Sequence, residues 1–557
     1  MDNHRHFGVD HDGDDIDGDD EFRYLIVRPE KGGLRDLFRY SVLQKVDSGV
    51  RFLEGSDEEV VGRVAGDHRW VIVVSIIARK IIGLFGKPLE WTGYLVDFIL
   101  NLLSLNGGLF GLLITLLHAG KVVVPQRGTE TFISTIGHFD GRIDLYKGEN
   151  LAETSLKAEL GNNRALMDLC MMAAKLAYEN AQVVRYIVVD HWKASYSCFL
   201  LSLFFGYMHF VKFYNCWNDF QKQMSTQVFM LCDKPKDANL ILISFRGTEP
   251  FDADDWSADF DYSWYEVPKL GKVHMGFLEA LGLGNRTNAV TFYNQLIEMQ
   301  KEFTSANCVD VSQRSSEGSK ASSSNIDSHM KQGGGDRFSK KIVPPDMGEK
   351  SAYYAVRRKL KSLLEEHKNA KFVVTGHSLG GALAVLFPSV LVLHEEMELM
   401  QRLLGVYTFG QPRVGNRKLG RYMEAHLNSL VPKYFRVVYC NDLVPRLPYD
   451  DKTFLYKHFG VCIYYDSQFN EQRMEEEPNR NYFGIRYLIP EYLNAVWELI
   501  RGLTMGYTYG PEYREGWFSI LLRIIGLVAP GVSAHCPTNY VDSVRLGKER
   551  IVQMSSF

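Results

Sequence analysis

The sequence predicts an α/β fold, a mostly parallel, doubly wound sheet with helices on both faces. Apolar, β-rich runs alternate with helical segments from about Gln227 onward. The strand-like runs NLILISF, KFVVTG, GVYTFG and YFRVVY are separated by YYAVRRKLKSLLEEHKNA, GGALAVLFPSVL and NRKLGRYMEAHL. Such alternation predicts parallel strands joined by crossover helices. Hydrophobic residues make up 46% and charged residues 23% of 557 residues, enough for a large core and for two or three structural units.

The first 22 residues are acidic and lack the apolar core of a secretory signal peptide, so we expect a disordered tail there. The eight cysteines include no CxxC pair, which favours reduced thiols in a cytosol-facing protein over a disulfide framework. The net charge of −4 and the absence of a basic stripe predict no nucleic-acid partner.

Residues 23–220 are expected to form an N-terminal region of apolar helices that associate with lipid. RWVIVVSIIARKIIGLFG (Arg69 to Gly86) contains Arg79 and Lys80, which favours an interfacial or buried helix over a membrane span. FILNLLSLNGGLFGLLITLL (Phe98 to Leu117) has 20 residues without a charge but has Asn-Gly-Gly at its middle. A straight span, a bent hairpin in one leaflet and a buried core helix all fit it. Residues 94–118 are the candidate anchor.

A third apolar block, Ser197 to Tyr214, is rich in aromatic residues and is expected to be an amphipathic or core helix. The catalytic α/β domain is expected to cover residues 221–557. Within it, residues 304–342 are rich in Ser, Gly and Lys without apolar periodicity, which predicts a disordered surface insertion.

GHSLG (Gly376 to Gly380) matches the G-x-S-x-G nucleophile elbow of the α/β hydrolase fold, with a β-rich run before it and a helical run after it. A serine on this sharp turn leaves no room for bulky residues two positions before or after it. The helix N-terminus behind it favours a developing negative charge. We therefore predict Ser378 as the nucleophile, and His377 as a structural neighbour whose side chain points elsewhere.

A nucleophilic serine needs a histidine base and an acid that orients the base. In this fold the chain order is serine, acid, histidine. Asp442 follows the strand-like FRVVY and begins a loop, so it is the predicted acid; the rival acids are Asp450, Asp451 and Asp466. His535 lies in a Gly/Pro/Ser-rich loop and is the predicted base, whereas His458 lies in a strand-like run typical of a satisfied core histidine.

The oxyanion hole needs two N–H donors. We expect the backbone N–H of Leu379, the residue after the nucleophile, to be one donor. We expect the backbone N–H of Thr248 in ISFRGTE to be the other. Downstream, PFDADDWSADFDYSW suggests a short mobile lid from Phe251 to Ala258 with Trp256 as its apolar residue, or else an acidic turn with a buried tryptophan. The acids of this stretch could suggest a divalent cation, but a serine hydrolase needs none, so we expect no metal and no cofactor.

FRGTE, VHMGF, VVTGHSLGGALA, FGQPRVGN and NDLVPRLP, in that order, resemble the class 3, fungal-type lipases. The resemblance covers roughly residues 225–460 and the His535 loop. It implies a triad of Ser378, Asp442 and His535, oxyanion donors at Thr248 and Leu379, and a lid near Phe251 to Ala258.

The apolar N-terminal half and the extended C-terminal part are more similar to the plant oil-body-associated triacylglycerol lipases. About ninety residues separate Asp442 from His535, far more than in the compact fungal enzymes. They include AVWELIRGLTMGYTYG and WFSILLRIIGLVAPG, which are apolar enough to pack against the lid or to contact lipid.

The expected function is hydrolysis of triacylglycerol by a serine esterase held, facing the cytosol, at the monolayer of a lipid droplet. Because a droplet has no aqueous far side, a bent hairpin suits it better than a span. The alternatives are a phospholipase A1 or galactolipase acting on bilayers, a non-catalytic membrane scaffold, and an esterase for small soluble esters. The complete triad argues against the scaffold, and the apolar blocks argue against the small-ester esterase. Self-association through the apolar blocks remains open.

Overall fold

The structure, a computed structural model, describes residues 23–118, 120–146, 164–192, 208–298, 351–427, 432–449, 455–482 and 484–549. The predicted acidic tail and the predicted insertion 304–342 lie outside these ranges.

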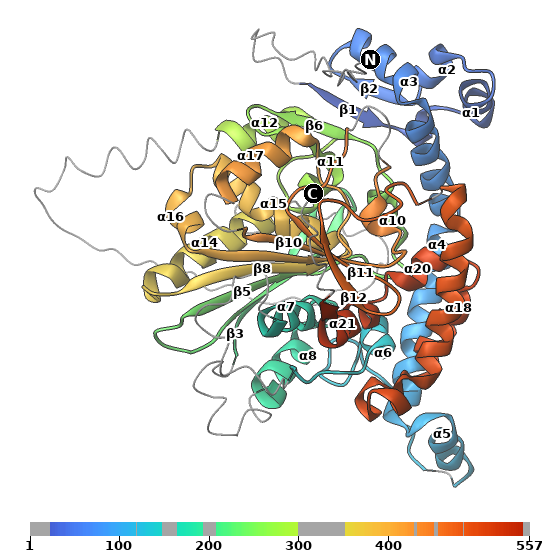
Figure 1. The fold of residues 1–557 in the computed structure, drawn as a ribbon, viewed down its shortest axis with the longest axis vertical. Helices are drawn as coiled ribbons and strands as arrows, with labels where there is room; N and C mark the ends of the chain where they lie inside the picture. The colour runs from blue at the N-terminus through green and yellow to red at the C-terminus, as the bar shows by residue number, and fades with distance from the viewer. Residues whose placement is uncertain are drawn as a thin grey trace, which may run out of the picture.

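A nine-stranded sheet forms the centre of the molecule, in the order β13-β12-β11-β10-β9-β8-β5-β4-β3 (Figure 1). Its five central strands, β5, β8, β9, β10 and β11, are parallel, and β3 and β4 extend one edge antiparallel. This confirms the predicted mostly parallel sheet. The strands are β3 (His209–Asn218), β4 (Gln223–Cys232), β5 (Leu240–Phe245), β8 (Lys371–His377), β9 (Leu403–Phe409), β10 (Tyr434–Tyr439), β11 (Val461–Tyr465), β12 (Asn470–Met474) and β13 (Lys548–Glu549).

Helices cover both faces of this sheet, as Figure 1 shows. Ile241 and Ile243 of β5 belong to a core shared with α14 (Ala352–Glu366) and α15 (Leu379–Leu393). Leu242 between them belongs to a second core, shared with α7 (Arg164–Leu176) and α21 (Pro537–Leu546). Neighbouring side chains of a strand point to opposite faces, which explains the continuous apolar runs in the sequence.

A smaller antiparallel sheet has the order β2-β1-β6-β7. Its strands are β1 (Tyr24–Val27), β2 (Leu53–Gly55), β6 (Trp264–Val267) and β7 (Gly271–His274). The start of the described chain thus pairs with strands that follow residue 221. The short helices α1 (Leu34–Ser41), α2 (Val46–Val50) and α3 (Glu58–Asp67) lie beside this sheet.

The first two apolar blocks form α4 (Arg69–Leu105) and α5 (Gly108–Leu117), which meet at a bend of 72°. The break falls on the Asn-Gly-Gly expected to interrupt the segment, where Gly107 and Gly108 have φ of 76° and 77°, a left-handed conformation that glycine adopts without strain. Within the described chain no single helix has the length and hydropathy to cross a membrane; the bent α4–α5 pair does so only when its two helices are taken together, by length and composition.

The prediction of a helix from Ser197 to Tyr214 is wrong where the structure describes that block. Residues 193–207 lie outside the described ranges, but His209–Asn218 is strand β3, paired antiparallel with β4. Aromatic and β-branched residues such as Phe210, Val211 and Phe213 fit a strand at least as well as a helix, and pairing with β4 decides between the two.

The other helical segments are listed here for reference: η1 (Pro29–Lys31), α6 (Thr135–Phe139), α8 (Ala181–Tyr186), η3 (Ile187–Trp192), α10 (Ala253–Asp259), α11 (Met275–Ala280), α12 (Val290–Tyr293), η4 (Asn294–Glu298), α16 (Met397–Gln401), α17 (Arg417–Leu427), η6 (Val444–Arg446), α18 (Ile485–Thr508), η7 (Pro511–Tyr513), α19 (Trp517–Gly526) and α20 (Pro530–Ala534).

Arg79, one of the two charges inside the first apolar block, attaches α4 to the rest of the fold. Its Nη1 donates to Asp261 Oδ1 at 2.9 Å and to the Val27 carbonyl at 2.9 Å. Asp261 is fully buried and also pairs with Arg286. Burial alone would raise the pKa of Asp261, but Arg79 and Arg286 outweigh burial and hold that pKa well below its usual range.

Replacing this arginine tests the attachment. Arg79→Met leaves part of the charge of Asp261 buried without a partner, so we expect the free energy of unfolding to fall by about 3 kcal/mol. The control is Arg63→Met, because Arg63 pairs with Glu59 in an exposed ion pair worth ~0–1 kcal/mol. Urea unfolding of both variants measures the difference, and equal losses would contradict the structural role of Arg79.

Candidate active site

The predicted nucleophile, Ser378, lies on the turn between β8 and α15. Its backbone has φ 58° and ψ −134°, a conformation that costs free energy for a residue with a side chain. Glycine is required on both sides: a Cβ on Gly376 would overlap the backbone of Gly380, and a Cβ on Gly380 would overlap the Phe245 carbonyl. The sequence spacing therefore corresponds to a real steric requirement at the elbow.

The backbone at Phe409-Gly410 lies between the serine and its two predicted partners. Ser378 N donates to the Phe409 carbonyl at 2.9 Å. Gly410 has φ of 58°, and a Cβ there would lie 2.9 Å from both Asp442 Oδ2 and His535 Cε1. Three residues that are far apart in the sequence are thus brought to the same end of the sheet.

His535 and Asp442 form a buried hydrogen-bonded pair. His535 Nδ1 lies 2.7 Å from Asp442 Oδ2, and it must be the donor because an ionised carboxylate only accepts. In the neutral imidazole, Nε2 then carries a free lone pair. His535 Nε2 and Ser378 Oγ are both buried, and neither has a hydrogen-bond partner among the described residues. This arrangement can accept a proton from the serine.

Asp442 is held by further groups that the sequence did not point to. Its Oδ1 accepts from the backbone N–H of Val444 at 2.8 Å, and Tyr540 of α21 donates its hydroxyl to Oδ2. Arg446 donates to the carbonyl of Asp442 and to that of Cys440. Because three hydrogen bonds hold it, from Val444, Tyr540 and His535, the carboxylate has a fixed orientation toward the imidazole.

The rival residues are engaged elsewhere or lie outside the described ranges. The side chain of His458 is buried and its Nε2–H donates to the Pro445 carbonyl at 2.7 Å, as expected of a satisfied core histidine. Asp466 accepts from Gln468 and Asn470 in a local turn. Residues 450–454 lie outside the described ranges.

The predicted oxyanion residues flank the serine. Leu379 is the first residue of α15, where a backbone N–H has no partner within the helix. Next to Thr248, a Cβ on Gly247 would lie 3.0 Å from Ser378 Cβ, so this loop packs directly against the serine. Thr248 Oγ1 donates to Asp259 Oδ2 at 3.3 Å. Asp259 is fully buried, and burial raises the pKa of its carboxyl to about 7.

The stretch predicted to contain a lid forms the short helix α10. The Trp256 ring meets the His535 ring edge-on, with 6.5 Å between ring centroids, and Trp256 Nε1 donates to the Pro250 carbonyl at 3.1 Å. α10 packs against α4. At the crossing, a Cβ on Gly93 would lie 2.6 Å from Phe251 Cβ. No group of three His, Cys, Asp or Glu side chains suited to a metal ion occurs in the part of the chain that the structure describes.

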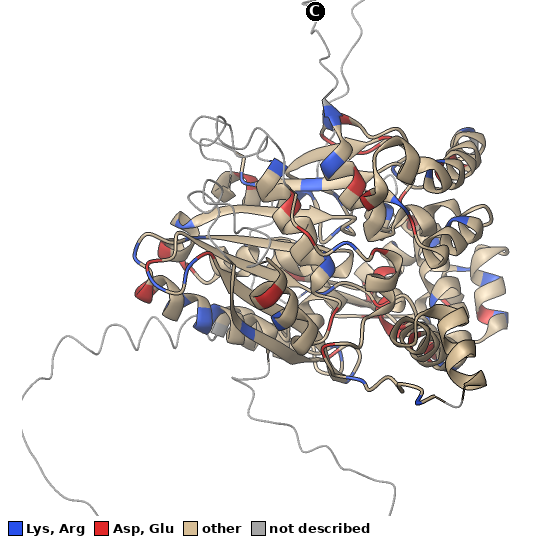
Figure 2. Ribbon diagram, turned by 90° about the horizontal axis from the view of Figure 1, so that it is seen from below, with Lys and Arg blue, Asp and Glu red and all other residues tan. Residues whose placement is uncertain are grey.

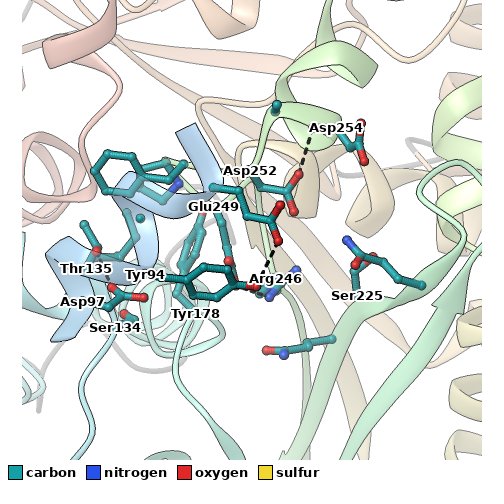
Figure 3. A pocket seen from close by; sticks show the side chains of 18 of the residues that line it. Tyr94, Asp97, Ser134, Thr135, Tyr178, Ser225, Arg246, Glu249, Asp252 and Asp254 are labelled. Atoms are coloured by element: carbon teal, nitrogen blue, oxygen red, sulfur yellow. Dashed lines mark hydrogen bonds and ion pairs between the residues drawn. The ribbon is translucent and has the colours of Figure 1, made fainter. Parts of the chain in front are cut away.

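A cavity of about 790 Å³ lies beside α10. It is lined mainly by polar residues from α4, from the segments at Ser134 and Tyr178, and from the start of β4 (Figure 3). Asp252, Asp254 and Ser257 of the lid stretch line it, whereas Trp256 does not. Its wall also includes Arg246, which is paired with Glu249. Ser378, Asp442 and His535 do not line this cavity, so the cavity is distinct from the predicted triad.

His377 connects the elbow to the loop that carries His535. Its Nε2–H donates to the His535 carbonyl at 3.0 Å, and its Nδ1 accepts from the Tyr178 hydroxyl at 2.7 Å. Burial and the neighbouring His535 lower the pKa of His377 well below its usual value, so the ring stays neutral. Both ring nitrogens are thus engaged with groups other than Ser378, and we expect His377 to position the backbone of His535.

Two substitutions of His377 test whether its hydrogen bond to the His535 carbonyl matters, or only the volume of its side chain. A glutamine amide reaches about as far as Nε2 and retains the donor, whereas an asparagine amide is too short. We expect His377→Asn to lower kcat for a soluble ester such as p-nitrophenyl butyrate roughly 10- to 100-fold at little changed KM. His377→Gln should stay within a few-fold of wild type. Equal loss in both variants would show that the bond to His535 is not what matters.

Comparison with known proteins places the chain in a family. The model of the family described as Lipase (class 3) matches residues 242–452. A protein of Nicotiana tabacum named triacylglycerol lipase OBL1 is 61% identical over 97% of each chain, and one of the same name from Arabidopsis thaliana is 58% identical over 96% of each. The crystal structure of a lipase from Rhizopus microsporus var. chinensis gives a TM-score of 0.31 at 19% identity, covering 60% of this chain and 84% of that chain. From the relatives that match almost the whole chain, this protein belongs to the class 3 lipases.

Proposed function

We propose that this class 3 lipase hydrolyses triacylglycerol through a triad of Ser378, His535 and Asp442. The observation that carries the proposal is the His535–Asp442 hydrogen bond of 2.7 Å beside a serine on a strained strand-to-helix turn. Tyr540 and Val444 fix the carboxylate, which in turn fixes the imidazole tautomer with its lone pair on Nε2.

In the proposed reaction, His535 Nε2 takes the proton of Ser378 Oγ as the oxygen attacks the ester carbonyl. The backbone N–H groups of Thr248 and Leu379 stabilise the tetrahedral oxyanion. His535 then gives its proton to the leaving glycerol oxygen, and the acyl chain stays on Ser378. Water repeats the sequence and releases the fatty acid, so that each proton taken by His535 is returned and no cofactor is consumed.

Access to this site requires movement of the lid stretch. Trp256 lies against His535 and Phe251 lies against Gly93, and we propose that the lid stretch covers the triad in this state. We propose that Phe251 and Trp256 turn toward lipid when α10 moves, since both side chains are apolar and lie on the stretch between the site and α4.

Triacylglycerol is the proposed substrate for two reasons. Relatives similar over nearly the whole chain are named triacylglycerol lipases. The chain also has an exposed apolar surface suited to a lipid phase: no residue of α5 is buried, and Phe110 and Leu117 are 79% and 83% exposed. Exposure on this scale is unfavourable in water and favourable at a lipid surface.

We propose that the bent α4–α5 pair holds the enzyme at the monolayer of a lipid droplet, with the catalytic domain on the cytosolic side. The 72° bend suits shallow insertion, and a droplet offers no aqueous far side for a straight span. The division into an N-terminal lipid-associating region, residues 23–220, and a catalytic domain, residues 221–557, is part of this proposal.

The test compares fatty-acid release by purified protein from emulsified triolein, phosphatidylcholine vesicles and galactolipid vesicles. We expect triolein to be preferred and Ser378→Ala to lower the rate by about 10⁴- to 10⁶-fold. Preference for the polar lipids would keep the triad but favour the phospholipase A1 or galactolipase alternative. Equal release by wild type and Ser378→Ala would refute the proposed nucleophile.

A further inference from the structure

Helix α18 is amphipathic, but most of its charged side chains face the protein interior and most of its apolar side chains face outward, the reverse of a helix that faces water. Its buried side carries Glu491, Glu498 and Arg501. Its outer side is an apolar stripe at helical spacing, formed by Ile489, Leu493, Val496, Ile500, Leu503 and Tyr507. Ile489 is 71% exposed and Tyr507 is 91% exposed. A helix that faces water normally shows the reverse arrangement.

Helix α19 repeats this inverted arrangement. Ser519 and Arg523 are buried, whereas Trp517, Leu521, Ile524 and Ile525 are exposed. α18 and α19 contact each other, and we call them together the C-terminal helical pair (residues 485–526). In Figure 1, α18 lies on the same flank as α4 and α5, and Figure 2 shows few charged residues along that flank.

Buried hydrogen bonds and ion pairs fix the orientation of the C-terminal helical pair. Arg523 pairs with Glu515 at 2.6 Å and donates to Asn539 Oδ1 at 2.9 Å. Arg501 donates to the Tyr439 hydroxyl at 2.9 Å, and that hydroxyl donates to Glu498 at 3.0 Å. Rotating either helix to bring its charges to the surface would break these contacts and leave other charges buried without partners, which is costly. The apolar faces therefore stay outward.

The C-terminal helical pair lies beside the predicted active site. α20, which directly precedes His535, contacts both α18 and α19. Asn539, the acceptor of Arg523, donates to the carbonyls of Ser533 and Ala534 at 3.0 and 3.3 Å. The pair is also continuous with the N-terminal helices, because Phe518 of α19 stacks on Phe139 of α6 with 4.5 Å between ring centroids, and α6 contacts α4.

We infer that the C-terminal helical pair is a second lipid-binding surface, which lays its apolar face on the phospholipid monolayer around the triacylglycerol. The inference rests on the proposed function. The stripe from Ile489 to Tyr507 extends for about 27 Å along the helix, long for a pocket but suited to a helix lying flat in an interface. Trp497 and Trp517 are exposed on the same helices, and tryptophan favours the boundary between headgroups and acyl chains.

The test places charges on this face in the full-length protein. The variant carries Leu493→Glu, Val496→Glu and Ile500→Glu, all at exposed positions. The matched control carries Met397→Glu, Gln401→Glu and Ala425→Glu, which make the same change of charge at exposed positions of α16 and α17. Partition onto phosphatidylcholine-coated triolein droplets is measured by flotation, and hydrolysis of soluble p-nitrophenyl butyrate reports on an intact site.

We expect the α18 variant to partition roughly 100-fold less than wild type, since three apolar side chains that enter the lipid are replaced by charges. Its rate on the soluble ester should be unchanged. The control should match wild type in both. If the α18 variant floats as well as wild type, the inference is wrong but the proposed function stands. If the wild-type protein does not float, the proposed function at a droplet is wrong as well. If wild type sediments as a dimer and the variant as a monomer with unchanged flotation, the face binds a second copy and the inference is wrong.

A second measurement needs no destabilising change. Brominated phosphatidylcholine quenches tryptophans that enter the acyl region. We expect quenching of wild-type fluorescence on droplets to be reduced in Trp497→Phe/Trp517→Phe, which keeps the face apolar. Undiminished quenching in that variant would mean that neither tryptophan enters the lipid, and it would contradict the inference even if the glutamate variant failed to fold.

Discussion

The close approach of β5, β8 and the start of α15 is the constraint on which the site depends. It is possible only because Gly376 and Gly380 have no side chain, since a Cβ on either would overlap backbone atoms. This contact forces Ser378 into its strained conformation and aims the N-terminus of α15 at the same point. The strain is stable because both flanking elements are buried in the core of the sheet.

Around that point, rigid contacts position the partners of the serine. His535 is held from two directions: Asp442 orients its ring, and His377 bonds to its backbone carbonyl. Because His377 is the residue next to Ser378, the elbow itself helps to place its base. The loop that carries His535 is also tied through Asn539 to the buried charges of α18 and α19, so helices that face lipid and a residue of the predicted triad share one hydrogen-bonded network.

The sequence predicted what depends on local chemistry. The order of strands and helices and the elbow at Ser378 could be predicted because glycine spacing and apolar runs reflect neighbours along the chain. The pairing of Asp442 with His535 required the chain order of the fold, since 93 residues separate them. Tyr540, Asp259 and Arg446 could not be predicted, because their contacts arise only from tertiary packing. The aromatic run that forms strand β3 fits a helix as well as a strand. The inward-facing charges of α18 do not show in its average hydropathy.

The proposed triad is tested most directly by covalent labelling with a p-nitrophenyl alkylphosphonate, which forms a stable adduct only with an activated serine. We expect one adduct per chain, located on Ser378 by peptide mass spectrometry. Labelling should be slowed by orders of magnitude in Asp442→Asn and His535→Ala. An adduct on another residue, or labelling of Ser378 at the same rate without His535, would contradict the triad.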